Sequence, residues 1–363
     1  MIDNKKIKVA IVSNSLGNGG AERFSALLSI MLDKSGFEVH SIIINDVVDY
    51  QYVGNLLNLE KESKGLPSFL KKIKKGFLLK DYLNKNNIKI IIDNRTRGLL
   101  IREIITKQIY GEAKKYYIVQ NCHFEKYFSS SLFWTRILYK NAEKIIGVSK
   151  EIEQNIKTKF KLNNTTTIYN TFYIDKNVLS KEVKNPDNVV LFFGRFDEKA
   201  KNFTLMLDAF LYSNIFKKGY RLHLLGAGDD LAFIKKKIID LGLESFVDIL
   251  PFKKSPFEEV QKAKFTILTS NYEGFPLSII ESLALGTPVI AVDCHSGPRE
   301  VIQNEFNGLL VEENNPHAFA FAMNRFVSDY ELYNFCKRNA SESVEHLSLE
   351  NITKKWENLI QLN

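Results

Sequence analysis

The chain is poor in cysteine and has no long run of apolar residues. Its three cysteines, Cys122, Cys294 and Cys336, are scattered without a CxxC pair or metal-ligand spacing, which indicates a reducing compartment. The longest apolar runs, such as 189–193 and 265–268, have the length of strands and not the ~20 residues of a membrane span. The apolar run after the basic N-terminus has about five residues, too few for a signal peptide. We therefore expect a cytoplasmic protein.

Two signatures of nucleotide binding are also missing. The sequence has no GxxxxGK(S/T) loop, so ATP hydrolysis is not indicated. The N-terminal GNGG lacks the GxGxxG spacing, which argues against a dinucleotide fingerprint. The single GxG, Gly226-Ala227-Gly228, indicates only a tight turn between a strand and a helix.

What the chain does contain is typical of a two-domain globular protein. Its 363 residues are too many for one ordinary core. Hydrophobic residues make up 45% and charged residues 25%, which excludes a disordered chain. The net charge of +8 favours an anionic partner, such as nucleic acid, anionic lipid or a phosphorylated substrate. A Lys-rich solvated surface would explain the charge equally well.

The first half alternates short apolar runs with helical patterns. The Gly-rich segment SLGNGG and an amphipathic helix over 21–34 follow the first run. The expected strands are 7–12, 39–44, 89–92, 117–120 and 144–148. Such alternation predicts a parallel, doubly wound sheet, which binds ligands beyond the carboxyl ends of its strands.

The same pattern restarts in the second half. The expected strands are 189–193, 221–225, 246–250, 265–268 and 289–292, with a helix over 203–212. The weakly patterned stretch 175–187 is the natural linker, and 347–362 predicts a last amphipathic helix. We therefore predict an α/β protein with two Rossmann-like, doubly wound domains that face each other across a cleft. They are an N-terminal domain at 1–174, a C-terminal domain at 175–345, and a helix at 346–363 that crosses back to the N-terminal domain.

Two carboxylates, Glu273 and Glu281, lie in the stretch SNYEGFPLSIIESLALGTPVIAVDCHSG at 270–297. Between them a Gly-Phe-Pro turn leads into an apolar helix expected to begin near 275 or 276. The free amides of such a helix start can bind an anion, and a carboxylate on each side can accept hydrogen bonds from paired sugar hydroxyls. The alternative is one solvated loop glutamate and one glutamate on a helix surface. The apolar neighbours of Glu281 argue against that alternative.

Two cations, Arg195 and Lys201, follow the strand motif VVLFFGRF and so lie at the edge of the sheet where ligands bind. Positive charge there suits a pyrophosphate that becomes a leaving group. Lys199 competes with Lys201 for the lysine role. The alternative is that these are ordinary surface cations.

In a series of separated motifs the chain resembles the retaining glycosyltransferases of family 4, which have the GT-B fold. The resemblance covers essentially the whole chain. The motifs are LGNGGAER at 16–23, IIGVSKEI at 145–152, IYNTF at 168–172, FFGRFDEKAKN at 192–202, LLGAGDD at 224–230, YEGFPLSIIESLALGTPVIA at 272–291 and NGLLV at 307–311. The resemblance implies a nucleotide-sugar donor, bound by the second half with neither a metal nor another cofactor.

The resemblance also implies roles for single residues. Arg195 and Lys201 would neutralise the leaving diphosphate, assisted by the backbone amides of 275–278. Glu273 would hold hydroxyls of the donor sugar, Glu281 those of the ribose, and Phe252 would lie against the base. The implied donor-binding residues are Gly19, Gly20, Gly194, Phe252, Gly274, Phe275, Pro276, Leu277, Ser278 and Glu281.

In the first half the family often carries a histidine at the end of the strand matched here by 117–120. His123 is the catalytic candidate for that place, and Gln120 or Asn121 is the alternative. Asp93 and Arg95, which follow the strand at 89–92, are acceptor or cleft candidates, and the alternative there is an Asx-type turn. A retaining mechanism can work without a protein base, since the leaving phosphate oxygen can take the acceptor proton.

The segment LPSFLKKIKKGFLLKDYL at 66–83 reads as a basic amphipathic helix that can rest on an anionic membrane surface. Its lysines include Lys71, Lys72, Lys74 and Lys75. The alternative is an outer helix with a solvated lysine face. Because the resemblance implies lipid-linked acceptors, we expect peripheral association with the inner face of the cytoplasmic membrane and no nucleic-acid partner.

These expectations favour a retaining glycosyltransferase. It would move a hexose or N-acetylhexosamine from a nucleotide sugar, UDP-linked by family frequency, to a glycan or lipid-linked glycan of a bacterial surface polysaccharide or glycoconjugate. The alternatives are a sugar-nucleotide epimerase, a phosphorylase, or a non-enzymatic subunit that binds nucleotide sugars. An epimerase needs an acid/base set and a phosphorylase a cofactor lysine, and neither is clear in the sequence. The presence of both glutamates and both cations argues against a degenerate site.

Overall fold

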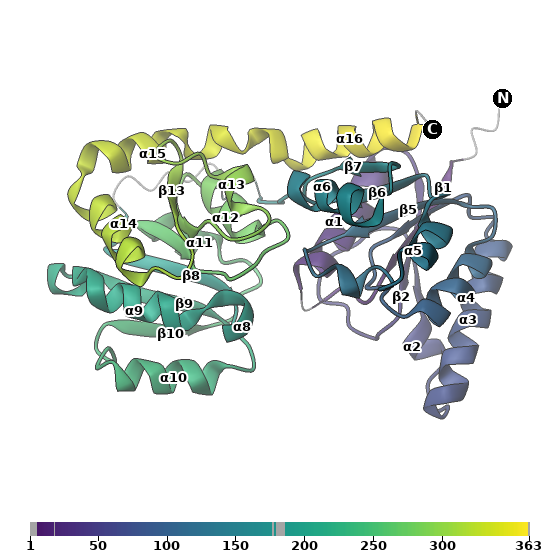
Figure 1. The fold of residues 1–363 in the computed structure, drawn as a ribbon, viewed down its shortest axis with the longest axis horizontal. Coiled ribbons are helices and arrows are strands. Elements are labelled where there is room, and N and C mark those ends of the chain that lie inside the picture. Colours follow the sequence, from purple (N-terminus) through teal and green to yellow (C-terminus); the bar gives the residue numbers. More distant parts are fainter. Residues whose placement is uncertain (1–5, 18, 176–177, 179–185, 362–363) are drawn as a thin grey trace. The chain divides into compact units, whose positions relative to one another are not determined.

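The computed structural model describes residues 6–17, 19–175, 178 and 186–361. These residues form two units, each built on its own parallel sheet (Figure 1). The N-terminal unit comprises 1–171 and 349–363, and the C-terminal unit comprises 172–348. The predicted fold class, two Rossmann-like α/β domains, is confirmed. The expected linker at 175–187 lies for the most part outside the described residues.

The sheet of the N-terminal unit has seven strands in the order β3-β2-β1-β4-β5-β6-β7. Its strands are β1 (Lys8–Ser13), β2 (Glu38–Ile43), β3 (Asn55–Asn58), β4 (Ile90–Asp93), β5 (Lys114–Val119), β6 (Lys144–Gly147) and β7 (Thr165–Thr167). The strand order reverses between β1 and β4, where ligands of doubly wound sheets bind. Strands β3 and β7 were not predicted, because neither short strand has an alternating or continuous apolar pattern.

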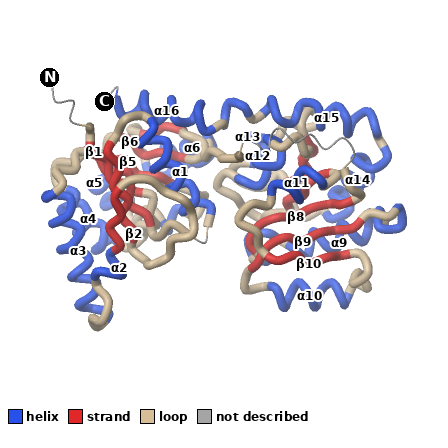
Figure 2. The backbone as a smooth tube through the Cα atoms, turned by 180° about the vertical axis from the view of Figure 1, so that it is seen from behind, coloured by secondary structure: helices blue, strands red, loops and turns tan. Residues whose placement is uncertain are grey.

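Helices cover the strands of each unit (Figure 2). Those of the N-terminal unit are α1 (Gly20–Lys34), α2 (Leu59–Glu62), α3 (Ser68–Lys85), α4 (Leu100–Tyr110), η1 (Phe124–Lys126), α5 (Leu132–Tyr139), α6 (Lys150–Phe160) and α16 (Leu349–Gln361). The C-terminal helix α16 crosses back to this unit, where buried Trp356 lies against Phe24 of α1 with ring centroids 6.3 Å apart. Large apolar burial of this kind fixes a terminal helix that would otherwise fray.

The sheet of the C-terminal unit has six strands in the order β10-β9-β8-β11-β12-β13. They are β8 (Val189–Arg195), β9 (Arg221–Ala227), β10 (Val247–Pro251), β11 (Phe265–Leu268), β12 (Val289–Val292) and β13 (Gly308–Val311). All the predicted strands of this half exist, and β13, which coincides with the NGLLV motif, was not predicted as a strand. It pairs in parallel with β12 and extends the edge of the sheet.

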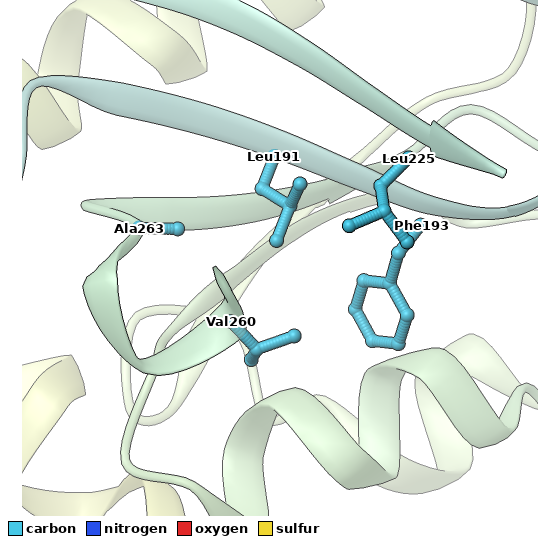
Figure 3. Close-up of a cluster of buried hydrophobic side chains, with 5 residues drawn as sticks. All are labelled: Leu191, Phe193, Leu225, Val260 and Ala263. Atoms are coloured by element: carbon cyan, nitrogen blue, oxygen red, sulfur yellow. The ribbon is translucent and has the colours of Figure 1, made fainter. Parts of the chain in front are cut away.

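The helices of the C-terminal unit pack onto both faces of its sheet. They are α8 (Glu198–Lys201), α9 (Phe203–Ser213), η2 (Ile215–Lys218), α10 (Leu231–Asp240), α11 (Phe257–Lys262), α12 (Leu277–Ala284), α13 (Pro298–Val301), α14 (Pro316–Ser328), α15 (Tyr330–Ser343) and η3 (Glu345–Leu347). One core cluster joins β8 and β9 to α11 and the residue after it. It consists of Leu191, Phe193, Leu225, Val260 and Ala263 (Figure 3).

Gly226 has a packing role that was not predicted for it. It lies inside β9, and a Cβ there would collide with the backbone carbonyl of Gly194 in β8. Only glycine allows the two strands to approach so closely at this point. The GxG therefore serves strand packing as much as the turn that was expected there.

None of the helices in the part of the chain that the structure describes combines the length and apolar composition needed to cross a membrane.

Candidate functional site

Three loops meet at the carboxyl edge of the C-terminal sheet. They follow β8, β11 and β12, and the carboxyl ends of parallel strands share one edge. The Thr269 hydroxyl donates to the carbonyl of Lys201 (2.8 Å), and the Asn271 amide donates to that of Ala200 (2.9 Å). The Ser296 hydroxyl donates to the carbonyl of Gly274 (3.1 Å). The loop after β11 is thereby tied to both of its neighbours.

Lys201 and Glu273 form an ion pair within this loop cluster. Nζ of Lys201 lies 2.6 Å from Oε1 of Glu273, and their side chains are 18% and 12% exposed. Ser270 donates its hydroxyl to the same carboxylate oxygen at 2.6 Å. Two donors on one oxygen hold the carboxylate in a single orientation. Ser270 was not singled out from the sequence, although its position three residues before Glu273 is a local signal.

Arg195 and Lys199 are placed differently from Lys201. Arg195 is exposed and makes a 3.7 Å ion pair with Asp197. Lys199 is also exposed, and its backbone carbonyl accepts a hydrogen bond from the Asn271 side chain (2.9 Å). The sequence left Lys199 and Lys201 as competitors, and the structure brings only the Lys201 ammonium onto Glu273.

The expected anion cradle corresponds to the start of α12. The helix begins at Leu277, slightly later than predicted, and Gly274, Phe275 and Pro276 before it are buried. The first amides of a helix have no intrahelical acceptor and are available to an anion. Pro276 has no N–H. Pro276 is therefore removed from the expected set of donating amides, and the amides of Leu277 and Ser278 lie in the first turn of the helix.

Glu281 lies in α12 and is only 2% exposed. This excludes the alternative of a solvated glutamate on a helix surface. Its neighbour Ser282 is buried as well, and its hydroxyl lies 2.7 Å from that of Thr266 in β11. Burying a carboxylate costs free energy unless it is hydrogen-bonded or paired, so a glutamate without a structural or functional role is unfavourable at this position.

Phe252 and Gly194 lie at the carboxyl ends of β10 and β8, which are separated in the sheet by β9. Strand β10 continues through Pro251, one residue beyond the expected strand 246–250, so the loop that carries Phe252 begins there. Proline is tolerated there because β10 is an edge strand. The Phe252 ring is 58% exposed and thus accessible to a flat partner. Gly194 is half-buried in β8, one residue before Arg195.

In the N-terminal unit, a buried chain of amide side chains crosses the carboxyl edge of the sheet. Asn94 donates to the Ala21 carbonyl and to the Ser25 hydroxyl, both at 2.8 Å, at the start of α1. Gln120 donates to Asn94 (3.0 Å), and Asn170 donates to Gln120 (3.1 Å). Asn170 was not a candidate, and its one signal was its place in the IYNTF motif.

The histidine candidate, His123, lies three residues after Gln120 in the sequence. His123 caps the short helix η1, and its Nδ1 lies 3.2 Å from Oε1 of Glu125. The Asn121 side chain accepts the His123 amide at 3.0 Å, a local Asx-type contact. The half-buried Gly19 precedes α1, and the exposed Gly20 is its first residue. A Cβ on Gly19 would collide with the carboxylate of Glu22.

Asp93 and Arg95 are not presented to solvent. Both are buried and form a bidentate pair, with Arg95 Nε 3.0 Å from Asp93 Oδ1 and Nη2 2.5 Å from Oδ2. The amide of Arg95 also donates to Asp93 Oδ1 (3.0 Å), which is the Asx-type turn considered as the alternative. Burial alone would raise the pKa of Asp93, but Arg95 and Arg97 lower it below its usual value. The expectation that these side chains face a substrate is therefore corrected.

Arg97 belongs to the same buried charge cluster. Its side chain has no exposed surface and donates to the carbonyls of Asp93, Arg95 and Ile118 at 2.8–2.9 Å. Its guanidinium also lies over the rings of Tyr117 and Tyr127. Arg97 was not a candidate, since nothing in the sequence marks an arginine as buried.

Two doubly wound domains in one chain, with a cationic loop cluster on the second, are typical of the GT-B class of glycosyltransferases. The crystal structure of Staphylococcus aureus TarM, solved as a mutant with fondaparinux, alpha-GlcNAc-glycerol and UDP, is similar to this chain with a TM-score of 0.79. The match is 16% identical and covers 98% of this chain and 99% of that structure.

Relatives of known name match along nearly the whole chain. The Campylobacter jejuni N-acetylgalactosamine-N,N'-diacetylbacillosaminyl-diphospho-undecaprenol 4-alpha-N-acetylgalactosaminyltransferase is 30% identical, over 92% of this chain and 93% of its own. The amylovoran biosynthesis glycosyltransferase AmsD of Erwinia amylovora is 23% identical, over 97% of this chain and 99% of its own. The family model for group 1 glycosyl transferases matches residues 175–343. The chain belongs to this family and is a glycosyltransferase.

Proposed function

We propose that this enzyme transfers a hexose or N-acetylhexosamine, with retention of configuration, from a nucleotide sugar to a glycan or lipid-linked glycan. The pathway would be the synthesis of a bacterial surface polysaccharide or glycoconjugate. The Campylobacter relative is named for a diphospho-undecaprenol acceptor and the Erwinia relative for amylovoran biosynthesis. The TarM structure contains UDP, which supports UDP as the carrier.

The observation that carries the proposal is the ion pair between Lys201 and Glu273 beside the start of α12. The ammonium is held in a partly dry site, where its attraction for a phosphate is stronger than in bulk water. With the exposed Arg195 and the first amides of α12, it would stabilise the negative charge of the departing diphosphate. Positive charge fixed in advance in this way requires little reorganisation during the reaction.

The two glutamates would select the sugar parts of the donor. Glu273, oriented by Ser270 and Lys201, has lone pairs left for hydroxyls of the transferred sugar. Glu281, buried in α12, would accept from the ribose hydroxyls. The exposed ring of Phe252 would stack on the base.

The proposed reaction is balanced without a protein base. The bond between the anomeric carbon and the diphosphate oxygen breaks, and a bond from the acceptor oxygen forms on the same face of the sugar. The acceptor proton passes to the leaving diphosphate oxygen, giving the glycoside and a nucleoside diphosphate. His123 and Asn121 remain candidates for acceptor contacts on this proposal.

The test is product analysis with a panel of nucleotide sugars and a lipid-linked or polysaccharide acceptor. We expect an acceptor mass increased by one hexose or N-acetylhexosamine, released nucleoside diphosphate, and an anomeric NMR coupling that matches the donor. An inverted product would overturn the retaining proposal. Epimerised donor with no glycoside would favour the epimerase, and donor binding without any turnover would favour the binding subunit.

We also propose that the side-chain cations, and not a bound metal, neutralise the diphosphate. Turnover after chelation with EDTA should then remain within about twofold of the untreated enzyme, since Lys201 and Arg195 supply the charge. A loss of activity that Mg²⁺ or Mn²⁺ restores would contradict this.

A further inference from the structure

Half of the exposed large apolar side chains among the described residues gather on three consecutive helices of the N-terminal unit. Helices α3, α4 and α5 lie side by side along the unit (Figure 1). The exposed apolar residues are Phe69, Leu70, Ile73 and Phe77 on α3, Leu99, Ile101 and Ile105 on α4 and its cap, and Leu132, Phe133 and Trp134 on α5. We name these ten residues the α3–α5 face. Exposed apolar side chains concentrated on neighbouring helices in this way mark an interaction site.

On α3 the apolar side chains form a stripe opposite the buried side of the helix. Phe69, Ile73 and Phe77 follow one another at four-residue intervals, and Phe69 and Phe77 are 71% and 70% exposed. The buried side of the same helix carries Leu79 and Leu83. A helix that is apolar on its inner side and again on its outer side can bury both sides only against a partner outside the unit.

The lysines of α3 divide into two groups with different tasks. Lys71 and Lys75 turn inward, and both bind the carboxylate of Glu60 in α2, at 2.6 and 2.5 Å. These contacts lower the pKa of Glu60 to about 2. Lys72, Lys74 and Lys80 are exposed beside the apolar stripe. The sequence-based expectation of a membrane contact through Lys71 and Lys75 is thus corrected to the outward lysines.

The neighbouring helices continue this combination of apolar and basic side chains. Arg102 on α4, and Arg136 and Lys140 at the end of α5, are exposed. The acidic residue of α4, Glu103, is buried, and α5 contains no acidic residue. On α3 the exposed acid is Asp81. Among the charged side chains that these three helices expose, positive charge therefore predominates.

We propose that the α3–α5 face docks on the surface of an anionic lipid bilayer. Aromatic and aliphatic side chains enter the boundary between headgroups and acyl chains, and the lysines and arginines reach the anionic headgroups. Trp134 is suited to that boundary, where tryptophan is enriched. A second copy of the chain fits less well, because a two-fold contact would bring the same cations against one another. This docking does not depend on the identity of the sugar donor.

The direct test is co-sedimentation of the full chain with vesicles, in the absence of any nucleotide sugar. We expect binding to phosphatidylcholine vesicles that contain phosphatidylglycerol, and weak binding to phosphatidylcholine alone. Binding should fall as salt is raised, because the headgroup attraction is screened. Failure to sediment with the anionic vesicles at low salt overturns the proposal, as does equal binding to both vesicles.

Paired variants separate the face from the rest of the surface. Phe69→Ser/Phe77→Ser should abolish vesicle binding, whereas Ile239→Ser/Phe321→Ser, at side chains of the C-terminal unit that are 61% and 67% exposed, should leave it unchanged. Lys72→Glu/Lys74→Glu should weaken binding by roughly tenfold or more. The matched Lys217→Glu/Lys218→Glu should not. Wild-type binding by both face variants overturns the proposal.

The two tryptophans of the chain provide a second readout. Trp356 is fully buried and Trp134 is 38% exposed, so a blue shift of the emission on adding anionic vesicles reports Trp134. Trp134→Phe should remove the shift while the variant still sediments. An unshifted wild-type spectrum in sedimenting samples overturns the orientation proposed. A dimer in light scattering that Phe69→Ser/Phe77→Ser dissociates, with no vesicle binding, assigns the face to a second copy instead.

Discussion

Lys201 and Glu273 are 72 positions apart in the sequence, and their side chains meet at 2.6 Å. The pair joins the short helix α8, which follows β8, to the loop after β11, at the edge of the sheet where the family resemblance places the donor. Because both side chains are mostly shielded from water, the pair fixes positive and negative charge in defined places before any substrate binds. Ser270 strengthens this arrangement by donating to the same oxygen.

We expect Lys201→Met and Glu273→Gln each to lower kcat by about 10²–10³ on the proposed mechanism, because each removes a group that acts on developing charge or on the transferred sugar. Ser270→Ala should cost less, about tenfold, since Ser270 only orients Glu273. Steady-state kinetics with the donor and acceptor found in the product analysis measure these effects. In a double-mutant cycle, Ser270→Ala and Glu273→Gln should be non-additive.

Lys199→Met is the matched control for the lysine assignment. Lys199 lies in the same short helix as Lys201, but its side chain is exposed. The kcat of this variant should stay within about threefold of the wild type. If Lys199→Met is as damaging as Lys201→Met, Lys201 is not the charge that matters.

Glu281→Gln should weaken nucleotide binding with little loss of fold, since glutamine keeps the shape of the buried side chain but loses the charge that strengthens its hydrogen bonds. A loss of about 1.5–3 kcal/mol of binding free energy corresponds to a roughly 10- to 150-fold higher Kd. Calorimetric titration with UDP and with UDP-sugars measures it. Glu331→Gln, at an exposed position of α15, is the control, and an unchanged Kd for Glu281→Gln would contradict the ribose role.

Arg95→Met should destabilise the N-terminal unit by about 3–5 kcal/mol, because it leaves the buried Asp93 carboxylate without its bidentate partner. The residual folded enzyme should keep its kcat and KM, since Arg95 is occupied within the unit. Urea unfolding and kinetics on the same preparations measure both. Arg136→Met, at an exposed position of α5, should alter neither. A large drop in kcat with full stability would restore Arg95 as a substrate contact.

His40 should make stability depend on pH between about pH 7 and 5. It is buried between Tyr82 (2.9 Å) and Glu38 (3.1 Å), and burial lowers its pKa, although Glu38 opposes this. As the pH falls below about 6.5, the usual pKa of histidine, His40 of the unfolded chain binds a proton that His40 of the folded chain does not bind. The free energy of unfolding therefore decreases, by at most about 1.4 kcal/mol per pH unit for one proton.

Urea unfolding of the wild type and of His40→Asn across that range tests the expectation. The variant should show a flatter profile, because asparagine does not titrate. Parallel profiles would mean that His40 does not govern stability in this window.

Much of the fold could be predicted because its signals are local. Apolar runs bounded by turn residues located β8, β9, β11 and β12 within a few residues, and periodic apolar patterns located α1, α3, α9 and α16. The strands β3, β7 and β13 were not predicted, because they form by pairing with neighbouring strands and have no clear apolar pattern of their own. Pairing at the edge of a sheet depends on tertiary context, so it cannot be predicted from the sequence of a short segment.

The candidate site, too, was predicted in part from the sequence and decided in part by the tertiary structure. Residue types and motif order were enough to point to Glu273, Glu281, Arg195 and Lys201. The choice between Lys199 and Lys201 depended on which ammonium reaches across to another loop. Likewise, Arg95 looked available in the sequence, and only the position of buried Asp93 and Arg97 around it shows that it is already engaged.

By itself, the sequence determined the two doubly wound domains, the family and the stretch that carries the two glutamates, because spacing and residue type are written along the chain. The tertiary structure decided which side chains meet. It paired Lys201 with Glu273 and Ser270, buried Glu281, turned Lys71 and Lys75 inward to Glu60, and left an apolar face on three helices. These outcomes depend on distances between residues far apart in sequence, which no local pattern encodes.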